Sequence, residues 1–303
     1  MNRVNLTLNI NSIALPAQQA AVRSSEIVDF MFGAIARGDL SKQAENQGTF
    51  YKFQSKEISA DARREAYEEW ILAKAFQDLM RGLKGSAELA YFFLELLSNP
   101  IKAKRETTID ELLAPFRKKA NGLNFPQLLE KINRHLPKPL NFSESYISLQ
   151  KARNCLEHRH GIVGKADLNA SKSLEIRIPY LKTYFLRDGE ETPLLPGTYI
   201  ETQTTIFARM DTRTISFQEG ERLRISLTDF NEIAFGCNQF AASLASAILA
   251  IANRVRRVSF INSNGSVHEV HSVPIGTDPY RYAENYNAKQ IQRGEEYRET
   301  VIS

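Results

Sequence analysis

One short segment combines the residue types that acid–base and phosphate chemistry require. Residues 149–161 read LQKARNCLEHRHG, and Arg153, Asn154 and His158 within them offer a permanent cation, an amide and an imidazole. An arginine can hold a phosphate through two parallel hydrogen bonds. A histidine titrates near neutral pH, so it can take or give a proton. We therefore take these three as candidate catalytic residues, with His160 as a candidate auxiliary acid or base.

The candidate residues must be positioned by a helix, predicted from Ser143 to about His160. On a regular helix Asn154 and His158 are four residues apart, so their side chains can meet. Arg153 points about 140° away from His158, but its side chain is long. Pairing with a second copy of the helix would bring two such sets into one cleft.

An arginine, a polar residue directly after it, and a histidine after four intervening residues resemble the signature of the HEPN superfamily. Arg153, Asn154 and His158 occupy these places. The resemblance implies a helical bundle that dimerises and joins both motifs in one cleft. It also implies a metal-independent endoribonuclease, without a cofactor, of bacterial defence, abortive-infection or toxin–antitoxin systems. Expected partners are RNA, a second copy of the chain, and a cognate antitoxin protein.

The resemblance also implies a role for each residue. The ribose 2′-OH attacks phosphorus and leaves a cyclic phosphate end, with His158 as the acid or base. Arg153 would stabilise charge on the phosphoryl oxygens, and Asn154 would orient the reacting groups. His160 stands where HEPN toxins paired with nucleotidyltransferase antitoxins usually carry a tyrosine.

Two other interpretations of the segment remain open. In the first, a HEPN-like fold holds RNA or a protein partner without cutting. In the second, Arg153 pairs with Glu157 four residues later, and His158 simply lies at a helix C-terminus, where basic residues are favoured. The intervening Cys155 is interpreted as a core thiol, because no environment that would lower its pKa is visible.

The composition restricts the classes of protein. Of the 303 residues 43% are hydrophobic and 24% charged, and the net charge of +4 permits an anionic partner without requiring one. Two cysteines are too few for a secreted disulfide scaffold, and the five histidines lack zinc-site spacing. The start lacks a signal-peptide pattern, and residues 234–252 favour a buried helix over a membrane span. We expect a cytoplasmic protein with no membrane partner and no metal.

The predicted fold class is mainly α with a β insertion (α+β), a HEPN-like helical bundle carrying a small antiparallel β module. Four ranges describe its organisation. They are a helical region with the Arg/His motif at 20–165, the β module at 166–227, a long helix packing back on the bundle at 228–258, and a hairpin with a polar C-terminal tail at 259–303.

Apolar residues at three- and four-residue spacing predict the helices before the motif. These are expected at 25–37, 59–83, 86–98, 107–120 and 125–135. Gly82 and Gly85 indicate a break between the second and third of them, and Trp70 is assigned to the apolar face of the second. Thr108 and Glu111 form a capping-box pair.

Alternating residues predict the strands. They are expected at 1–16, 174–178 and 199–210, and in a hairpin of 215–217 with 223–227. Asp188-Gly189 and Glu219-Gly220 mark turns. A last hairpin is expected at 258–272, with Asn264-Gly265 at its turn.

Overall fold

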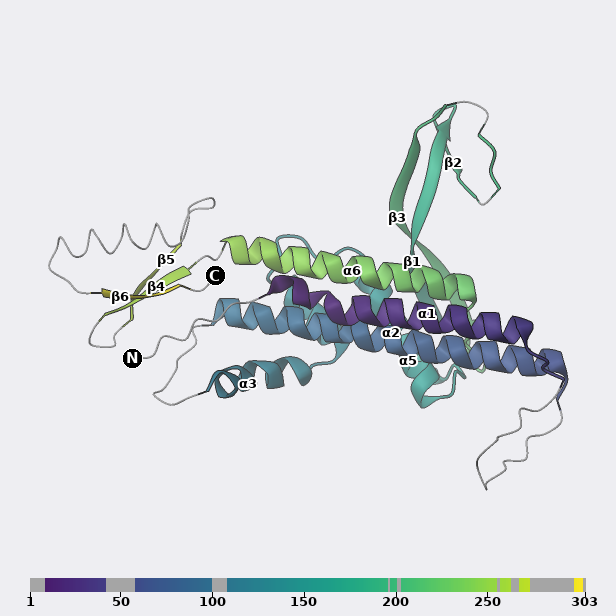
Figure 1. Ribbon diagram of the computed structural model, residues 1–303, viewed down its shortest axis with the longest axis horizontal. Coiled ribbons are helices and arrows are strands. Elements are labelled where there is room, and N and C mark those ends of the chain that lie inside the picture. Colours follow the sequence, from purple (N-terminus) through teal and green to yellow (C-terminus); the bar gives the residue numbers. More distant parts are fainter. Residues whose placement is uncertain are drawn as a thin grey trace, which may run out of the picture. The chain divides into compact units, whose positions relative to one another are not determined.

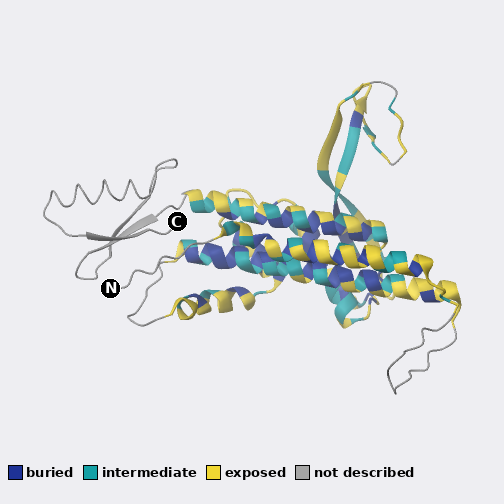
Figure 2. Cartoon of the chain, in the orientation of Figure 1, coloured by how far each residue is buried: buried dark blue, intermediate teal, exposed yellow. Residues whose placement is uncertain are grey.

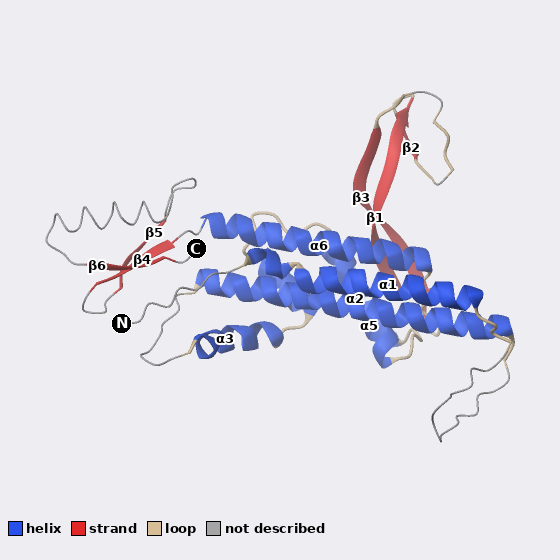
Figure 3. Ribbon diagram, in the orientation of Figure 1, coloured by secondary structure: helices blue, strands red, loops and turns tan. Residues whose placement is uncertain are grey.

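The protein is mainly α-helical with two small antiparallel sheets, which confirms the predicted α+β class (Figure 3). A computed structural model describes residues 9–41, 58–99, 108–195, 197–200, 203–254, 257–262, 267–272 and 297–301, with side chains up to residue 253. The chain divides into two compact units. One comprises residues 1–15, 85–140 and 241–303, and the other comprises 16–84 and 141–240.

Helix α1 (Leu15–Arg37) lies along the first part of α2 (Ala60–Ser98) in the second unit (Figure 1). Their approach is close at Gly82, where a Cβ atom would lie 2.4 Å from Ala20 Cβ and 2.6 Å from the Pro16 carbonyl oxygen. Gly82 therefore permits close packing, and the predicted break at Gly82 and Gly85 is wrong. Glycine costs a helix about 1 kcal/mol relative to alanine, and the packing of α1 outweighs this cost.

Two further predictions, for the N-terminal strand and for the orientation of Trp70, are wrong. Residues 9–16 hold a 3-10 turn (Ile10–Ile13) and the beginning of α1 instead of an edge strand, while residues 1–8 lie outside the described part. Trp70 does not face the core, since it is 62% exposed. The buried side of α2 is formed instead by Phe76, Leu79 and Leu83.

The first unit contains the second part of α2 with α3 (Ile109–Asn121) and α4 (Phe125–Asn133). Thr108 and Glu111 form the predicted capping box of α3, and α4 begins with a second box between Asn124 and Gln127. An ion pair of 2.7 Å between Lys119 and Glu95 joins α3 to α2.

The same unit carries a three-stranded antiparallel sheet of β4 (Arg257–Asn262), β5 (Val267–Ser272) and β6 (Tyr297–Val301), in the order β5-β4-β6. The pairing of β4 with β5 confirms the predicted hairpin. Its expected turn, Asn264-Gly265, lies outside the described residues.

The predicted β module consists of β1 (Ser173–Arg187), β2 (Glu190–Pro193) and β3 (Ile206–Gln218), in the order β2-β1-β3. Asp188 and Gly189 both have positive φ angles, of 54° and 85°, and form the predicted turn between β1 and β2.

The predicted second hairpin around Gly220 is wrong. Residues 206–218 form one strand, because β1 is long enough to pair with all of it, from Phe185 to Ser173. After the turn at Gly220 the chain runs beside the end of helix α5 (Ser143–His158) instead: the Leu223 amide donates to the Gly161 carbonyl at 2.7 Å.

The β1–β3 ribbon has a buried base and is mostly exposed toward its tip, where Phe185 is the buried exception among the described residues of β1 (Figure 2). At the base, Ile176 and Ile178 are buried, and the Arg177 amide donates to Ser148 Oγ of α5 (Ser143–His158) at 2.8 Å. Farther out the ribbon leaves the helices (Figure 1). There the Thr212 amide donates to its neighbour Asp211 Oδ1 at 2.8 Å.

Helix α6 (Leu227–Arg254) returns the chain to α5 in the second unit. The Tyr146 hydroxyl donates to the Gly236 carbonyl at 2.7 Å, and its ring lies 4.1 Å from that of Phe240. Residues 227–253 are long and apolar enough to cross a membrane by length and composition, and 44% of the window tested is buried inside the protein. Core helices of soluble proteins pass the same test, so the helix is compatible with a soluble protein.

Candidate functional site

Helix α5 positions the motif by burying one face. Tyr146, Leu149, Ala152 and Cys155 recur at three-residue steps, and all four are buried. The residues between them are therefore turned toward the flank of the helix. Arg153, Asn154 and Glu157 are half-buried there, and His158 occupies the last turn.

Arg153 is held by its own helix. It forms an ion pair with Glu157, and its Nη1 donates to Asn154 Oδ1 at 3.2 Å. The Arg153 and Glu157 side chains are 22% and 31% exposed. Glu157 Oε2 lies against the guanidinium, yet within the described residues no donor points at it with hydrogen-bond geometry. The pair is thus electrostatic and loosely directed, and it matches the alternative in which Arg153 pairs along the helix.

His158 is separated from the other two candidates. Its side chain is 62% exposed, and its Nε2 lies 3.8 Å from Glu157 Oε2. The expected meeting of Asn154 and His158 does not form in the described structure, because Asn154 Oδ1 accepts from Gln150 Nε2 at 3.1 Å and from Arg153. The structure therefore brings Arg153, Asn154 and Glu157 together and leaves His158 facing solvent.

The auxiliary candidate His160 lies beyond the helix. Its φ angle is 52°, and Gly161 follows with 79°. The Arg159 and Gly161 amides both donate to the Cys155 carbonyl, at 3.0 and 3.2 Å, which closes the helix end. His160 is exposed and lies past the residues that line the flank of α5.

A second arginine–carboxylate pair lies six residues later and was not predicted. Arg159 donates from Nε to Asp167 Oδ2 at 2.6 Å and pairs with the other carboxylate oxygen through Nη2. The Gly164 amide donates to Asp167 Oδ2 at 3.0 Å, and the Asp167 side chain is only 2% exposed. The pair ties the segment after α5 to the helix end, which is a structural role.

The environment of Cys155 excludes a ready nucleophile. Burial, followed by the charge of Asp167, raises the pKa of the Cys155 thiol to about 11. Burial likewise raises the pKa of the Cys237 thiol to about 12. Both side chains are therefore protonated near neutral pH, as expected of core thiols. In the described part of the chain no group of three or more His, Cys, Asp or Glu side chains could hold a metal ion.

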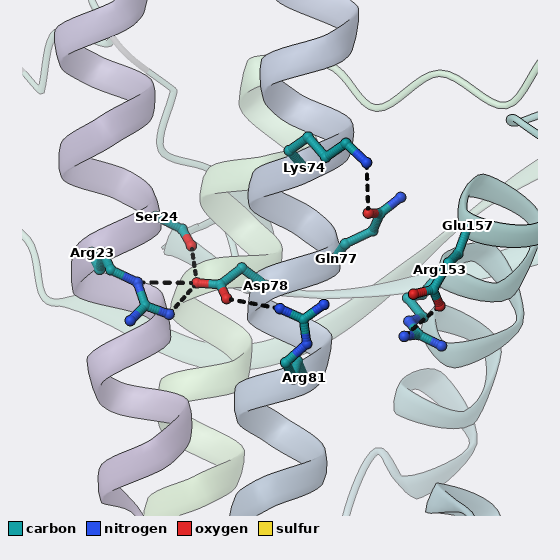
Figure 4. A network of polar contacts seen from close by, with 8 residues as sticks. All are labelled: Arg23, Ser24, Lys74, Gln77, Asp78, Arg81, Arg153 and Glu157. Atoms are coloured by element: carbon teal, nitrogen blue, oxygen red, sulfur yellow. Dashed lines mark hydrogen bonds and ion pairs between the residues drawn. The ribbon is translucent and has the colours of Figure 1, made fainter.

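Polar side chains of α2 face the motif. In Figure 4, Lys74 and Gln77 point from α2 toward α5, where Arg153 and Glu157 point back toward α2. Lys74 Nζ donates to Gln77 Oε1 at 3.4 Å. These α2 side chains were not predicted as neighbours of the motif.

The flank of α2 toward α1 is also polar. Asp78 accepts from Arg23 and from Ser24 of α1, and Arg81 lies 3.7 Å from its other oxygen (Figure 4). Arg81 is 69% exposed, so its guanidinium remains accessible to a ligand.

The arrangement can bind an anion and transfer a proton. Arg153 supplies a half-buried positive charge of the type that holds a phosphate, and His158 supplies a solvent-facing imidazole. Comparisons of the chain with protein-family models, curated proteins and solved structures found no match.

Proposed function

We propose that the chain is a HEPN-like, metal-independent endoribonuclease whose site is Arg153, Asn154 and His158. The observation that supports this most is the half-buried Arg153–Glu157 pair, in which the buried Glu157 Oε2 receives no well-directed hydrogen bond from the described residues. A phosphate offers the guanidinium two well-directed hydrogen bonds, so it can displace Glu157 at low cost. Asn154 keeps the guanidinium at this flank while the carboxylate is exchanged.

The proposed reaction needs two proton transfers. One imidazole takes the proton of the ribose 2′-OH while O2′ bonds to phosphorus. The bond from phosphorus to the 5′ oxygen breaks, and a second imidazole protonates that oxygen. The products are a 2′,3′-cyclic phosphate and a 5′-hydroxyl. His158 would supply one imidazole, since its Nε2 lies 3.8 Å from Glu157, the partner of Arg153, and we expect the second to come from a second copy of the chain.

The biological setting belongs to the same proposal. A cytoplasmic nuclease of this kind acts in bacterial defence, abortive infection or a toxin–antitoxin pair, and a cognate antitoxin would hold it in check. Covering His158 would suffice for inhibition, because that side chain faces solvent.

A second candidate function is a non-catalytic module that binds RNA or a protein. The Glu157 carboxylate favours it, since it neutralises Arg153 and lies 3.8 Å from His158 Nε2. A site used only for binding does not need His158 to be free.

A cleavage assay separates these functions. A mixed RNA pool is incubated in EDTA with the wild type, with His158→Ala and with His135→Ala. His135 is a matched control, because it is also an exposed histidine near a helix end. The nuclease predicts cyclic phosphate ends, a loss of about 100- to 10,000-fold in His158→Ala, and no loss in the control. Equal cutting by all three removes His158 from the mechanism, and binding without cutting by any leaves the non-catalytic module.

A further inference from the structure

One stripe of α2 carries a mixture of aromatic and cationic side chains. The stripe is formed by Trp70, Lys74, Gln77 and Arg81. Its members follow one another at four-, three- and four-residue steps, so they share one side of the helix within about 60°. All four belong to the same compact unit as Arg153. Gln77 is buried, whereas Trp70, Lys74 and Arg81 are exposed, and we call this side of the helix the α2 stripe.

The α2 stripe exposes a large aromatic side chain that contributes little to the core. Trp70 is 62% exposed and is the chain's single tryptophan. Tyr67, one turn earlier, is 45% exposed. Exposed aromatic rings are stacking platforms for nucleic-acid bases, and the stacking tolerates any base.

The two cations of the α2 stripe lie about two helical turns apart. Lys74 is exposed and Arg81 is 69% exposed, and seven residues of helix separate them by about 10.5 Å along the axis. Arg81 shares Asp78 with Arg23 and Ser24 of α1, so this one carboxylate does not neutralise it fully. The stripe therefore keeps positive charge available.

The α2 stripe leads into the candidate site. Figure 4 shows Lys74 and Gln77 of α2 directed toward the Arg153–Glu157 pair of α5. A strand whose phosphate reaches Arg153 would therefore meet the exposed Lys74 next, and Trp70 one turn beyond Lys74. Cations beside an exposed ring are the combination that grooves for single-stranded nucleic acid use.

We propose that the α2 stripe binds the single-stranded RNA flanking the scissile phosphate, with Lys74 and Arg81 on phosphates and Trp70 stacked on a base. This inference rests on the proposed function and names its substrate class as unpaired RNA. A duplex offers no free base face to Trp70, so it is a poorer ligand.

A direct test uses the tryptophan as a reporter. The full chain is titrated with a single-stranded RNA of about 12 nucleotides, labelled with fluorescein and 2′-O-methylated so that it cannot be cut. Stacking predicts quenching of Trp70 emission together with a rise in RNA anisotropy. Trp70→Ala should weaken binding roughly 5- to 100-fold, the effect of one lost base stack. The exposed position of Trp70 allows the variant to fold.

The cations are tested by salt dependence. Lys74→Gln with Arg81→Gln should lower the slope of log affinity against log salt by about 1.4, at about 0.7 per lost phosphate contact. The matched control is Arg64→Gln with Lys118→Gln, two exposed cations that lie off the stripe. The control removes the same amount of charge from positions off the stripe. It should therefore leave the slope near that of the wild type.

Three results would overturn the inference. One is RNA binding without quenching of Trp70. Another is an equal loss of RNA affinity in the Lys74→Gln, Arg81→Gln variant and in its control. The third is an emission of Trp70 that changes on protein dilution without RNA, because this would assign the stripe to a second copy of the chain.

The proposed function fails separately. Quenching and stripe-dependent binding, without any cleavage of unmodified RNA, would refute the nuclease and leave the α2 stripe as an RNA-binding surface. Cleavage that depends on His158 but not on the stripe would support the nuclease and refute the α2 stripe as its RNA-binding surface.

Discussion

Two arginine–carboxylate pairs, six residues apart on the same stretch of chain, have opposite properties. Arg159 binds a buried carboxylate, Asp167, which also accepts from the Gly164 amide. Arg153 binds Glu157, which is half-exposed and one turn away on the same helix. The first pair joins residues eight apart across the turn after α5, whereas the second joins residues that the helix already holds together.

The difference shows how burial decides the role of a charged pair. A buried carboxylate without its partner is costly, so Arg159 cannot exchange Asp167 for another anion. A half-exposed pair within one helix contributes well under 1 kcal/mol, so Arg153 can exchange Glu157 at little cost to stability. Ligand binding is therefore expected at Arg153 and not at Arg159, although the same amino acid occupies both positions.

The largest expected effect is on the free energy of unfolding, when the Arg159 partner of the buried Asp167 carboxylate is removed. Arg159→Gln leaves the Asp167 charge uncompensated inside the protein, and we expect a loss of about 3–5 kcal/mol in the free energy of unfolding. Urea unfolding followed by circular dichroism measures it. Arg153→Gln is the matched variant, with an expected loss below about 1 kcal/mol. Equal losses in the two variants would contradict the comparison.

An intermediate effect is expected on the pKa of the Cys155 thiol, which the charge of Asp167 raises. The raised pKa means that folding favours the protonated thiol, so its contribution to stability is complete below pH 9 and lost as pH rises toward about 11. Asp167→Asn removes a charge that raises this pKa. The pH midpoint for alkylation of Cys155 by iodoacetamide should therefore move down.

Cys237 serves as the internal control for this measurement. Burial alone raises its pKa to about 12, with no contribution from Asp167. Mass spectrometry distinguishes the two alkylated residues. If both thiols gain reactivity equally, Asp167→Asn has opened the fold, and the electrostatic explanation of the Cys155 pKa is wrong.

The smallest effect is expected on the half-buried pair within helix α5. Glu157→Gln frees Arg153 of its competing anion, so the affinity for single-stranded RNA should rise about two- to fivefold. The free energy of unfolding should change by no more than about 0.5 kcal/mol. Anisotropy and urea unfolding measure the two quantities. A weaker affinity for RNA would show that Glu157 helps to orient Arg153 and does not compete with the phosphate.

Local signals predicted the elements that local interactions determine. The capping box at Thr108 and the turn at Asp188-Gly189 each depend on side chains and φ angles within four residues, and both formed. Gly82 failed as a helix breaker because its meaning depends on Ala20 of another helix. Strand β3 was divided wrongly because its length is determined by its partner β1.

The site was likewise predictable only where it depends on interactions within one helix. The i to i+4 spacing offered Glu157 as a partner for Arg153, since the two lie on one helix. Periodicity placed Trp70 on the apolar face, because hydrophobicity alone does not tell a buried ring from an exposed one. The pairing of Arg159 with Asp167 spans a turn with two glycines, Gly161 and Gly164, and no spacing rule covers it.

The open edge of the ribbon bears on how the protein behaves at high concentration. In the described part of the chain, β3 has β1 on one side and no strand on the other, and such edges template aggregation. Charges at Arg209, Asp211 and Arg213 alternate along it, and the Asp211 carboxylate occupies the Thr212 amide that an incoming strand would use. The ribbon can thus extend into a crowded cell while resisting amyloid-like growth from its edge.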